Sequence, residues 1–383
     1  MASSAAKTRR RSRCARPFAL SGEPLEQRAL LTAFTDYEFL PAATFQLPDT
    51  PTPANRGPAV FDTLADGRIV VLSTFLANPF DTFGTPEMYV ETAVGSRTWQ
   101  SLGTLSLAPG GQWFSLGGAF LEVSPGGNQI AVGDNAFSTQ RVGVFETTDL
   151  LTLGAGSMPI DWYQVPHFAA EWYDERFLAI NYGDFSTSAV SLLDTLTSPA
   201  APNNPDVVNG VGGASSSVTF DDDGNLYVGN GFDTQPGGST TGDIRQFLLT
   251  DWTQAHTSGT PLSFETSGSL YTTMLSAGSM QFDDESNLFV GGSDFFGSGQ
   301  ADFLGLIEDP AQGSGVRTFD PDTAATSSYR LDYNPVTGEL YANEPFLLVE
   351  PVDNTIVYVI SAGPVADAGG PYSGDEGTMI PLS

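Results

Sequence analysis

Clustered carboxylates are the first residues of this sequence that could do chemistry. Asp221 to Asp223 are consecutive and are followed by Gly224 and Asn225. Carboxylate and amide oxygens suit calcium, but a calcium loop of the EF-hand type places its acids at alternate positions before a glycine at the sixth. Consecutive acids fail that spacing, whereas Asp, Asn and Gly are the residues that a tight β-turn selects. We therefore expect a hairpin turn here, and another at 283–287.

Other catalytic residue types are sparse. The chain has two histidines, His167 and His256, and one cysteine, Cys14. The sequence contains no Gly-x-Ser-x-Gly elbow, no Cys/His spacing for zinc and no P-loop. A catalytic triad therefore has no support from local motifs, and we assign no catalytic residue.

Five tryptophans offer a further possibility, a carbohydrate-stacking surface. Most of them fall in segments that we expect to be strands, where packing in the core is the simpler use of a large aromatic ring. They are Trp99, Trp113, Trp162, Trp172 and Trp252.

A repeated hairpin forms the framework that positions the carboxylates and the tryptophans. The phrase at 218–230, VTFDDDGNLYVGN, returns at 280–292 as MQFDDESNLFVGG, and four weaker copies occur elsewhere. Each copy has alternating apolar residues on either side of a turn, which predicts a β-hairpin. The copies are 48 to 62 residues apart, as marked by Gly67, Gly127, Glu175, Gly224, Ser286 and Gly338.

A third apolar segment, and often a fourth, follows each hairpin. The third segments are 88–91, 142–145, 189–193, 244–249, 304–308 and 356–360. Six repeats of about 50 residues with four strands each predict an all-β fold, a six-bladed β-propeller with four-stranded antiparallel blades. We expect residues 36–47 to supply the outer strand of the last blade and so close the ring.

Propeller geometry directs attention to one end of the second strands. Within a blade the first strand starts, and the second ends, at the same mouth of the central channel, so polar residues there can converge. Asp134, Asn181, Asn230 and Glu344 occupy such positions. Their oxygens make them candidate ligands for Ca²⁺ or Mg²⁺.

The blade pattern, hydrophobic-Asp-x-Asp-Gly-Asn-Leu-Tyr-Val, resembles that of the NHL and gluconolactonase/regucalcin-like six-bladed propellers over residues 35–362. In the metal-dependent lactonases of that group, a strand-end Asp, an Asn before a first strand and a Glu of another blade hold a divalent cation. The resemblance implies this role for Asp134, Asn230 and Glu344. The segments before four of the first strands, 57–59, 117–119, 215–217 and 327–329, contain no Asn.

Charge excludes one class of partner. The formal net charge is −30, and seven of the 15 basic residues lie within the first 28 positions. The remaining body is strongly acidic and repels phosphate backbones, so we expect no nucleic-acid binding. No apolar run of 18 residues occurs, so we expect no membrane span. Cys14 has no second cysteine with which to pair.

Both ends differ from the body. Residues 1–34 form a basic leader, and PLEQRALLTA at 24–33 resembles the LEPR-XLL export motif of planctomycete-like bacteria, with Gln27 in place of its proline. The last segment, residues 363–383, contains PVADAGGPYSGDEG at 364–377 and resembles the first strand of a PKD-like β-sandwich. A complete sandwich of this kind needs about 100 residues. We therefore expect a leader, a propeller at 35–362 and the start of an incomplete PKD-like domain.

Two functions from different classes remain. The first is a non-catalytic extracellular or cell-surface module for recognition or structure within a larger multidomain protein, monomeric and binding a protein, a glycan or a small molecule. The second is a secreted, lactonase-like hydrolase that uses a divalent metal at the channel mouth. The sequence favours the first, because the leader and the tail point to export while local motifs provide no acid-base pair.

Overall fold

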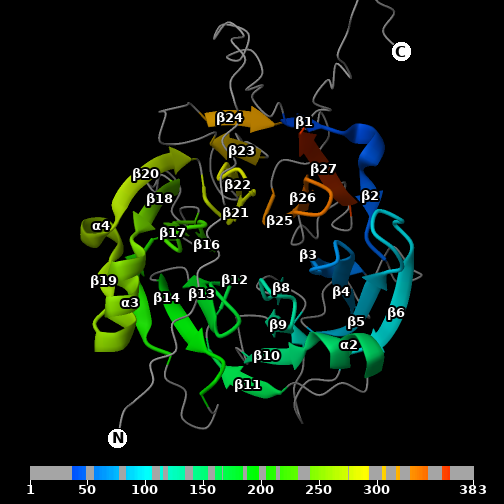
Figure 1. Cartoon of the computed structure of the whole chain (residues 1–383), viewed down its shortest axis with the longest axis horizontal. Helices are drawn as coiled ribbons and strands as arrows, with labels where there is room; N and C mark the ends of the chain where they lie inside the picture. The colour runs from blue at the N-terminus through cyan, green and yellow to red at the C-terminus, as the bar shows by residue number, and fades with distance from the viewer. Residues whose placement is uncertain are drawn as a thin grey trace, which may run out of the picture. The chain divides into compact units, whose positions relative to one another are not determined.

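Hairpins of alternating apolar residues assemble into six small antiparallel sheets. The computed structural model describes residues 37–48, 56–76, 83–105, 113–114, 120–133, 141–153, 160–165, 167–183, 188–197, 204–212, 216–231, 242–274, 276–292, 304–307, 316–319, 328–343 and 356–362. They belong to one compact unit, Tyr37–Ala362. Figure 1 shows the sheets arranged around a common centre, as the repeat predicts for a six-bladed propeller.

The first three blades share one plan, in which strands of increasing number lie progressively farther from the centre (Figure 1). Blade 1 consists of β3 (Arg56–Thr63), β4 (Ile69–Leu76), β5 (Phe83–Glu91) and β6 (Trp99–Thr104), with β7 (Trp113–Phe114) pairing with β5. Blade 2 consists of β8 (Phe120–Val123), β9 (Gln129–Gly133), β10 (Arg141–Glu146) and β11 (Asp161–Gln164). Blade 3 consists of β12 (Ala169–Trp172), β13 (Phe177–Gly183), β14 (Ser188–Asp194) and β15 (Asp206–Val211).

Blades 4 to 6 complete the ring. Blade 4 consists of β16 (Ser217–Phe220), β17 (Leu226–Gly229), β18 (Gly242–Phe247) and β20 (Ser269–Met274). Blade 5 consists of β21 (Ser279–Phe282), β22 (Leu288–Gly291), β23 (Leu304–Ile307) and β24 (Val316–Phe319). Blade 6 consists of β25 (Arg330–Asn334), β26 (Glu339–Asn343) and β27 (Ile356–Ala362).

The outer strand of blade 6 comes from the other end of the chain, as predicted. β1 (Tyr37–Phe39) and β2 (Phe45–Gln46) flank the 3-10 turn η1 (Pro41–Ala43), and both strands pair antiparallel with β27. The Tyr37 hydroxyl also donates to Asp283 of blade 5 at 2.5 Å. The inner strands contact one another in a closed order, β3, β8, β12, β16, β21, β25 and back to β3.

Apolar side chains between neighbouring blades form the core. Val60 and Leu72 of blade 1, for example, pack with Leu121 and Ile130 of blade 2. Contact between blades is closest at the ends of β17 and β22, because a Cβ on Gly229 would lie 2.4 Å from the Ala277 side chain, and one on Gly291 2.4 Å from the Ser328 carbonyl oxygen. Glycine ends these strands because the next blade leaves no room for a side chain.

An insertion in blade 4 was not predicted. β18 ends at Phe247, whereas the sequence predicted a strand to Leu249, because α3 (Leu249–Ser258) begins there and the Asn225 amide oxygen accepts the Leu249 N–H at 3.1 Å. α4 (Phe264–Ser267) and β19 (Leu262–Ser263) follow, and β19 pairs in parallel with β15 of blade 3. The remaining helix, α2 (Thr147–Leu153), follows β10. None of the helices in the described part of the chain is long and apolar enough to cross a membrane.

Candidate functional site

The predicted strand-end metal ligands are described only in part. Asp134 and Glu344 lie outside the described residues. Asn181 and Asn230 are buried, and the Asn181 side-chain nitrogen donates to the Ser217 carbonyl at 3.0 Å, which links blade 3 to blade 4. Within the described ranges no group of three acidic, histidine or cysteine residues is arranged to hold a metal. A metal held by all four predicted ligands therefore stays a prediction.

The acidic segments form hairpin turns, as predicted, and the first carboxylate of each accepts hydrogen bonds within its turn. Asp221 accepts the Asn225 backbone N–H at 2.8 Å, the Asn225 side-chain N–H at 2.9 Å and the Tyr227 hydroxyl at 3.1 Å. Asp283 holds Asn287 in the same way, at 2.8 and 2.7 Å. These carboxylate oxygens stabilise the turns by accepting hydrogen bonds, which supports the interpretation of both segments as hairpin turns.

Replacing Asp221 with alanine is expected to lower the free energy of unfolding by about 2 kcal/mol, because several charge-assisted hydrogen bonds to the turn are lost. Asp222→Ala is the matched control, since that side chain is exposed in the same turn and its loss should change the free energy by less than about 0.5 kcal/mol. Urea unfolding measures both. Equal effects for the two variants would contradict this role of Asp221.

The histidines and the described tryptophans pack within the fold. The His167 ring lies edge-on to Phe120, and the His256 ring edge-on to Phe177, where burial lowers the pKa of His256. The indole nitrogens of Trp172 and Trp252 each donate to a backbone carbonyl at 3.0 Å, those of Glu122 and Gly224. Trp99 is partly exposed and packs beside Phe45, and the side chains of Trp113 and Trp162 lie outside the description.

A set of acids on the inner strands was missed by the sequence analysis. Every inner strand has one equivalent position, which lies two residues before the first residue of its hairpin turn. Its occupants in blades 1 to 6 are Asp62, Glu122, Glu171, Thr219, Gln281 and Asp332. Four of the six are acidic, and Arg330 lies two residues before the last of them. The four acids and Arg330 are named the channel cluster below.

Arg330 joins three blades within the channel cluster. Its guanidinium makes an ion pair with Glu122 at 2.6 Å and donates to the carbonyls of Phe61, at 3.3 Å, and of Leu121. Blade 6 is thereby tied to blades 1 and 2. Burial raises the pKa of Glu122 well above its ordinary range, although Arg330 acts in the opposite direction.

Asp62 and Asp332 share a hydrogen bond between their carboxyl groups. Two ionised carboxylates are both acceptors, so one of the pair must carry a proton. Asp62 accepts the backbone N–H groups of Thr63 and Val123, and Asp332 accepts the Thr63 hydroxyl. Burial, and then the charge of Asp62, raises the pKa of Asp332 well above its ordinary range.

Glu171 differs from the other acids because, among the described residues, it has no hydrogen bond or ion pair. Burial, and then the negative charges of Asp62 and Asp332, raises its pKa to about 8, while Arg330 lowers it. An acid with this pKa is largely protonated at pH 7, and a cation that comes close favours its ionised form.

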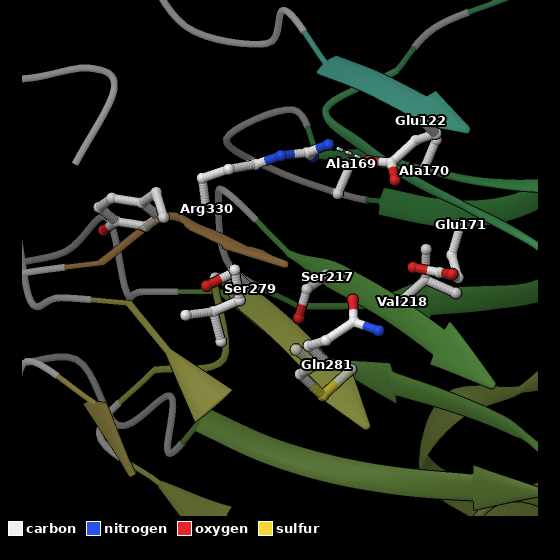
Figure 2. A pocket seen from close by; sticks show the side chains of 13 residues that line it. Glu122, Ala169, Ala170, Glu171, Ser217, Val218, Ser279, Gln281 and Arg330 are labelled. Carbon is white, nitrogen blue, oxygen red and sulfur yellow. Dashed lines mark ion pairs between the residues drawn. The ribbon is translucent and has the colours of Figure 1, made fainter. Parts of the chain in front are cut away.

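A small cavity lies beside Glu171 at the centre of the ring. Its volume is about 30 Å³, and the inner strands of blades 2 to 6 or the residues just before them line it. Figure 2 shows Glu122, Glu171, Ser217, Gln281 and Arg330 around this space, with the ion pair between Glu122 and Arg330 at one side. A cavity of this size holds one or two water molecules or a chemical group of similar size.

One signal in the sequence could have revealed the channel cluster. In the aligned hairpins, all four acids of the channel cluster fall at the same position of the inner strand, and those of blades 2 and 3 interrupt an otherwise apolar strand. A charged residue in such a strand is costly unless it is paired or functional. The partners of these acids, however, lie on other blades, and the hairpin pattern does not show which blades bring their residues together.

Comparison with known proteins supports the fold alone. No protein-family model and no curated protein matches the sequence. Among solved structures, the α-L-arabinofuranosidase of Fusarium graminearum with an iminosugar inhibitor has a TM-score of 0.51 and 10% identity, covering 83% of this chain and 97% of that chain. A mutant of that enzyme gives 0.52 and 11%, covering 84% and 98%. The β-propeller domain of the Trilobed protease from Pyrococcus furiosus gives 0.39 and 13%, covering 80% and 83%.

Proposed function

We propose that this chain is a recognition module of an exported, multidomain protein and that it binds its ligand in the central channel. The cavity carries the proposal, because inner-strand segments of five blades place charged and polar groups around one small space. A space of this size accepts one small group of a ligand. The export-like leader and the PKD-like tail support a place outside the cell.

The test is binding of the purified chain to a panel of glycans, peptides and small amines, with Glu171→Gln as the channel variant. A ligand that binds the wild type and is lost on this substitution supports recognition in the channel. Glu38→Gln is the matched control, since Glu38 is exposed on β1. Ligands that bind both variants and the wild type equally would place recognition elsewhere and contradict the proposal.

A hydrolase is the second candidate, and one observation favours it. Glu122 and Glu171 line the same cavity, the first paired with Arg330 and the second without a cation. Two carboxyls in different environments are the arrangement that glycosidases use as an acid and an ionised partner. The structural neighbours include an arabinofuranosidase. The alternative from the sequence, a metal-dependent lactonase, is also a hydrolase but cleaves an ester instead of a glycosidic bond.

Assays with aryl arabinosides and simple lactones, the latter with and without Ca²⁺, distinguish the two functions. Recognition predicts no turnover above the buffer rate for either substrate. Turnover that falls at least 100-fold in Glu171→Gln, while Glu38→Gln retains it, would replace the recognition proposal with hydrolysis.

A further inference from the structure

We propose that the channel cavity binds a primary ammonium group, presented by a small amine or by a lysine side chain. The inference rests on the proposed recognition function and names the chemistry of its ligand. It is carried by the charges around the cavity, by the direction of the hydrogen bonds that its side chains make, and by its size.

The charge balance of the channel cluster favours a cation. Four carboxyl groups face one guanidinium, and Arg330 is already engaged by Glu122 and by two backbone carbonyls. Asp62 and Asp332 lower their joint charge by sharing a proton. Glu171 has no hydrogen-bond or ion-pair partner among the described residues, so a cation beside it would be its first direct partner.

Hydrogen bonds around the cavity leave acceptors without donors. The Ser217 hydroxyl donates to the Ala277 carbonyl at 2.7 Å, and the Ser279 hydroxyl to the Ser328 carbonyl at 3.1 Å. A hydroxyl whose proton is committed in this way can only accept a further bond. The Gln281 side-chain nitrogen donates to the Phe282 carbonyl at 3.3 Å, which leaves its oxygen as an acceptor.

Two further polar groups next to the cavity lack partners among the described residues, and both can accept a hydrogen bond. Asn181 and Ser216 are both 0% exposed, and within the described part of the chain neither the Asn181 side-chain oxygen nor the Ser216 hydroxyl has a partner. Asn181 binds the carbonyl of the cavity-lining Ser217, and Ser216 precedes it in the chain. Buried polar groups without partners are rare and indicate a missing ligand or water.

An ammonium group fits this combination best. It brings one positive charge and three N–H donors in a compact head, and a cavity of about 30 Å³ has room for a head of that size. Calcium would need six to eight oxygen ligands. The cavity offers fewer: the Glu171 carboxylate, two hydroxyls, one amide oxygen and the Glu122 carboxylate, which Arg330 already engages. The planar guanidinium of arginine is larger and carries five donors.

Isothermal titration calorimetry with methylammonium chloride tests the proposal, with tetramethylammonium and calcium chlorides at equal ionic strength as comparisons. We expect saturable binding of methylammonium, a rise in melting temperature, and no binding of tetramethylammonium, which has no N–H donor. Binding should weaken at least tenfold in Glu171→Gln, because a charge-assisted hydrogen bond is lost, and should be unchanged in the exposed control Glu38→Gln.

Proton release provides a second measurement on the wild type alone. Glu171 is largely protonated at pH 7 and must ionise to pair with an ammonium, so binding should release up to one proton. Titrations in buffers of different ionisation enthalpy count it. The groups that face Glu171 are Glu122, Asp62, Asp332 and Arg330. Affinity should rise from pH 6 to 8 and level off until the amine deprotonates near pH 10.

A second probe, Nα-acetyl-lysine N-methylamide, separates the two sources of the ammonium group. Tighter binding of this compound than of methylammonium assigns the site to a lysine side chain, and weaker binding assigns it to a small amine. Failure of both probes, or an equal response to calcium that is lost in Glu171→Gln, overturns the ammonium proposal. A channel ligand without a cationic N–H group would overturn it too, yet would leave the recognition function standing.

Discussion

Replacing Arg330 with methionine is expected to lower the free energy of unfolding at pH 7 by about 3 to 5 kcal/mol, the usual cost of leaving a buried charge uncompensated. Glu122 would lose its ion pair, and the carbonyls of Phe61 and Leu121 would lose their donor. Methionine preserves most of the volume, so the loss would report the charge rather than a void. Urea unfolding followed by tryptophan fluorescence measures it.

Two further variants separate the charge effect from general damage. Arg68 pairs with Asp66 at 2.8 Å, but the Asp66 side chain is 55% exposed, so Arg68→Met should cost less than about 1 kcal/mol. Adding Glu122→Gln to Arg330→Met should recover part of the lost stability, because the stranded carboxylate is then neutral. If the double variant is no more stable than the single one, Arg330 does not act through the charge of Glu122.

The propeller was predictable because its signals are local. Apolar alternation, the Asp and Gly of the turns, and their period all lie within single hairpins, and they specify strands whatever the neighbouring blade contains. Even the closure by β1 and β2 followed from counting strands, since the last blade was one short. The sequence analysis missed the helical insertion after Phe247 because it extended the third apolar segment of this blade to Leu249, where α3 begins.

The channel cluster could not be predicted in the same way, because it depends on which residues meet across the ring. Arg330 contacts Glu122 although several blades separate them along the chain, and nothing in either hairpin specifies that contact. The metal-ligand role predicted for the strand-end residues stays a prediction, although Asn181 lies buried within β13 and donates to the carbonyl of the cavity-lining Ser217. Its amide connects two blades, a structural use that strand-end position alone does not imply.

The contribution of Glu171 to the stability of the wild type is expected to fall as the pH rises from about 4.5 to 8 and to level off above that range. Burial raises the pKa of Glu171 from 4.5 in the unfolded chain to about 8 in the folded chain. Between these values the folded state binds more protons than the unfolded state, so unfolding becomes easier with each increase in pH. The stabilisation is complete below pH 4.5 and is lost as the pH passes through 8, with a limiting slope of about 1.4 kcal/mol per pH unit for one group.

Glu171→Gln isolates this contribution, since glutamine does not titrate in either state. The variant should equal the wild type near pH 5 and exceed it in stability by pH 9, where the wild type must bury a charge that the variant lacks. His256, whose lowered pKa favours folding as the pH rises toward 6.5, affects both proteins equally and cancels in the difference. Glu122 and Asp332 act in the same direction as Glu171, so some slope should persist. Glu38→Gln should follow the wild type throughout, and a difference between wild type and Glu171→Gln that does not change with pH would show that Glu171 keeps an ordinary pKa.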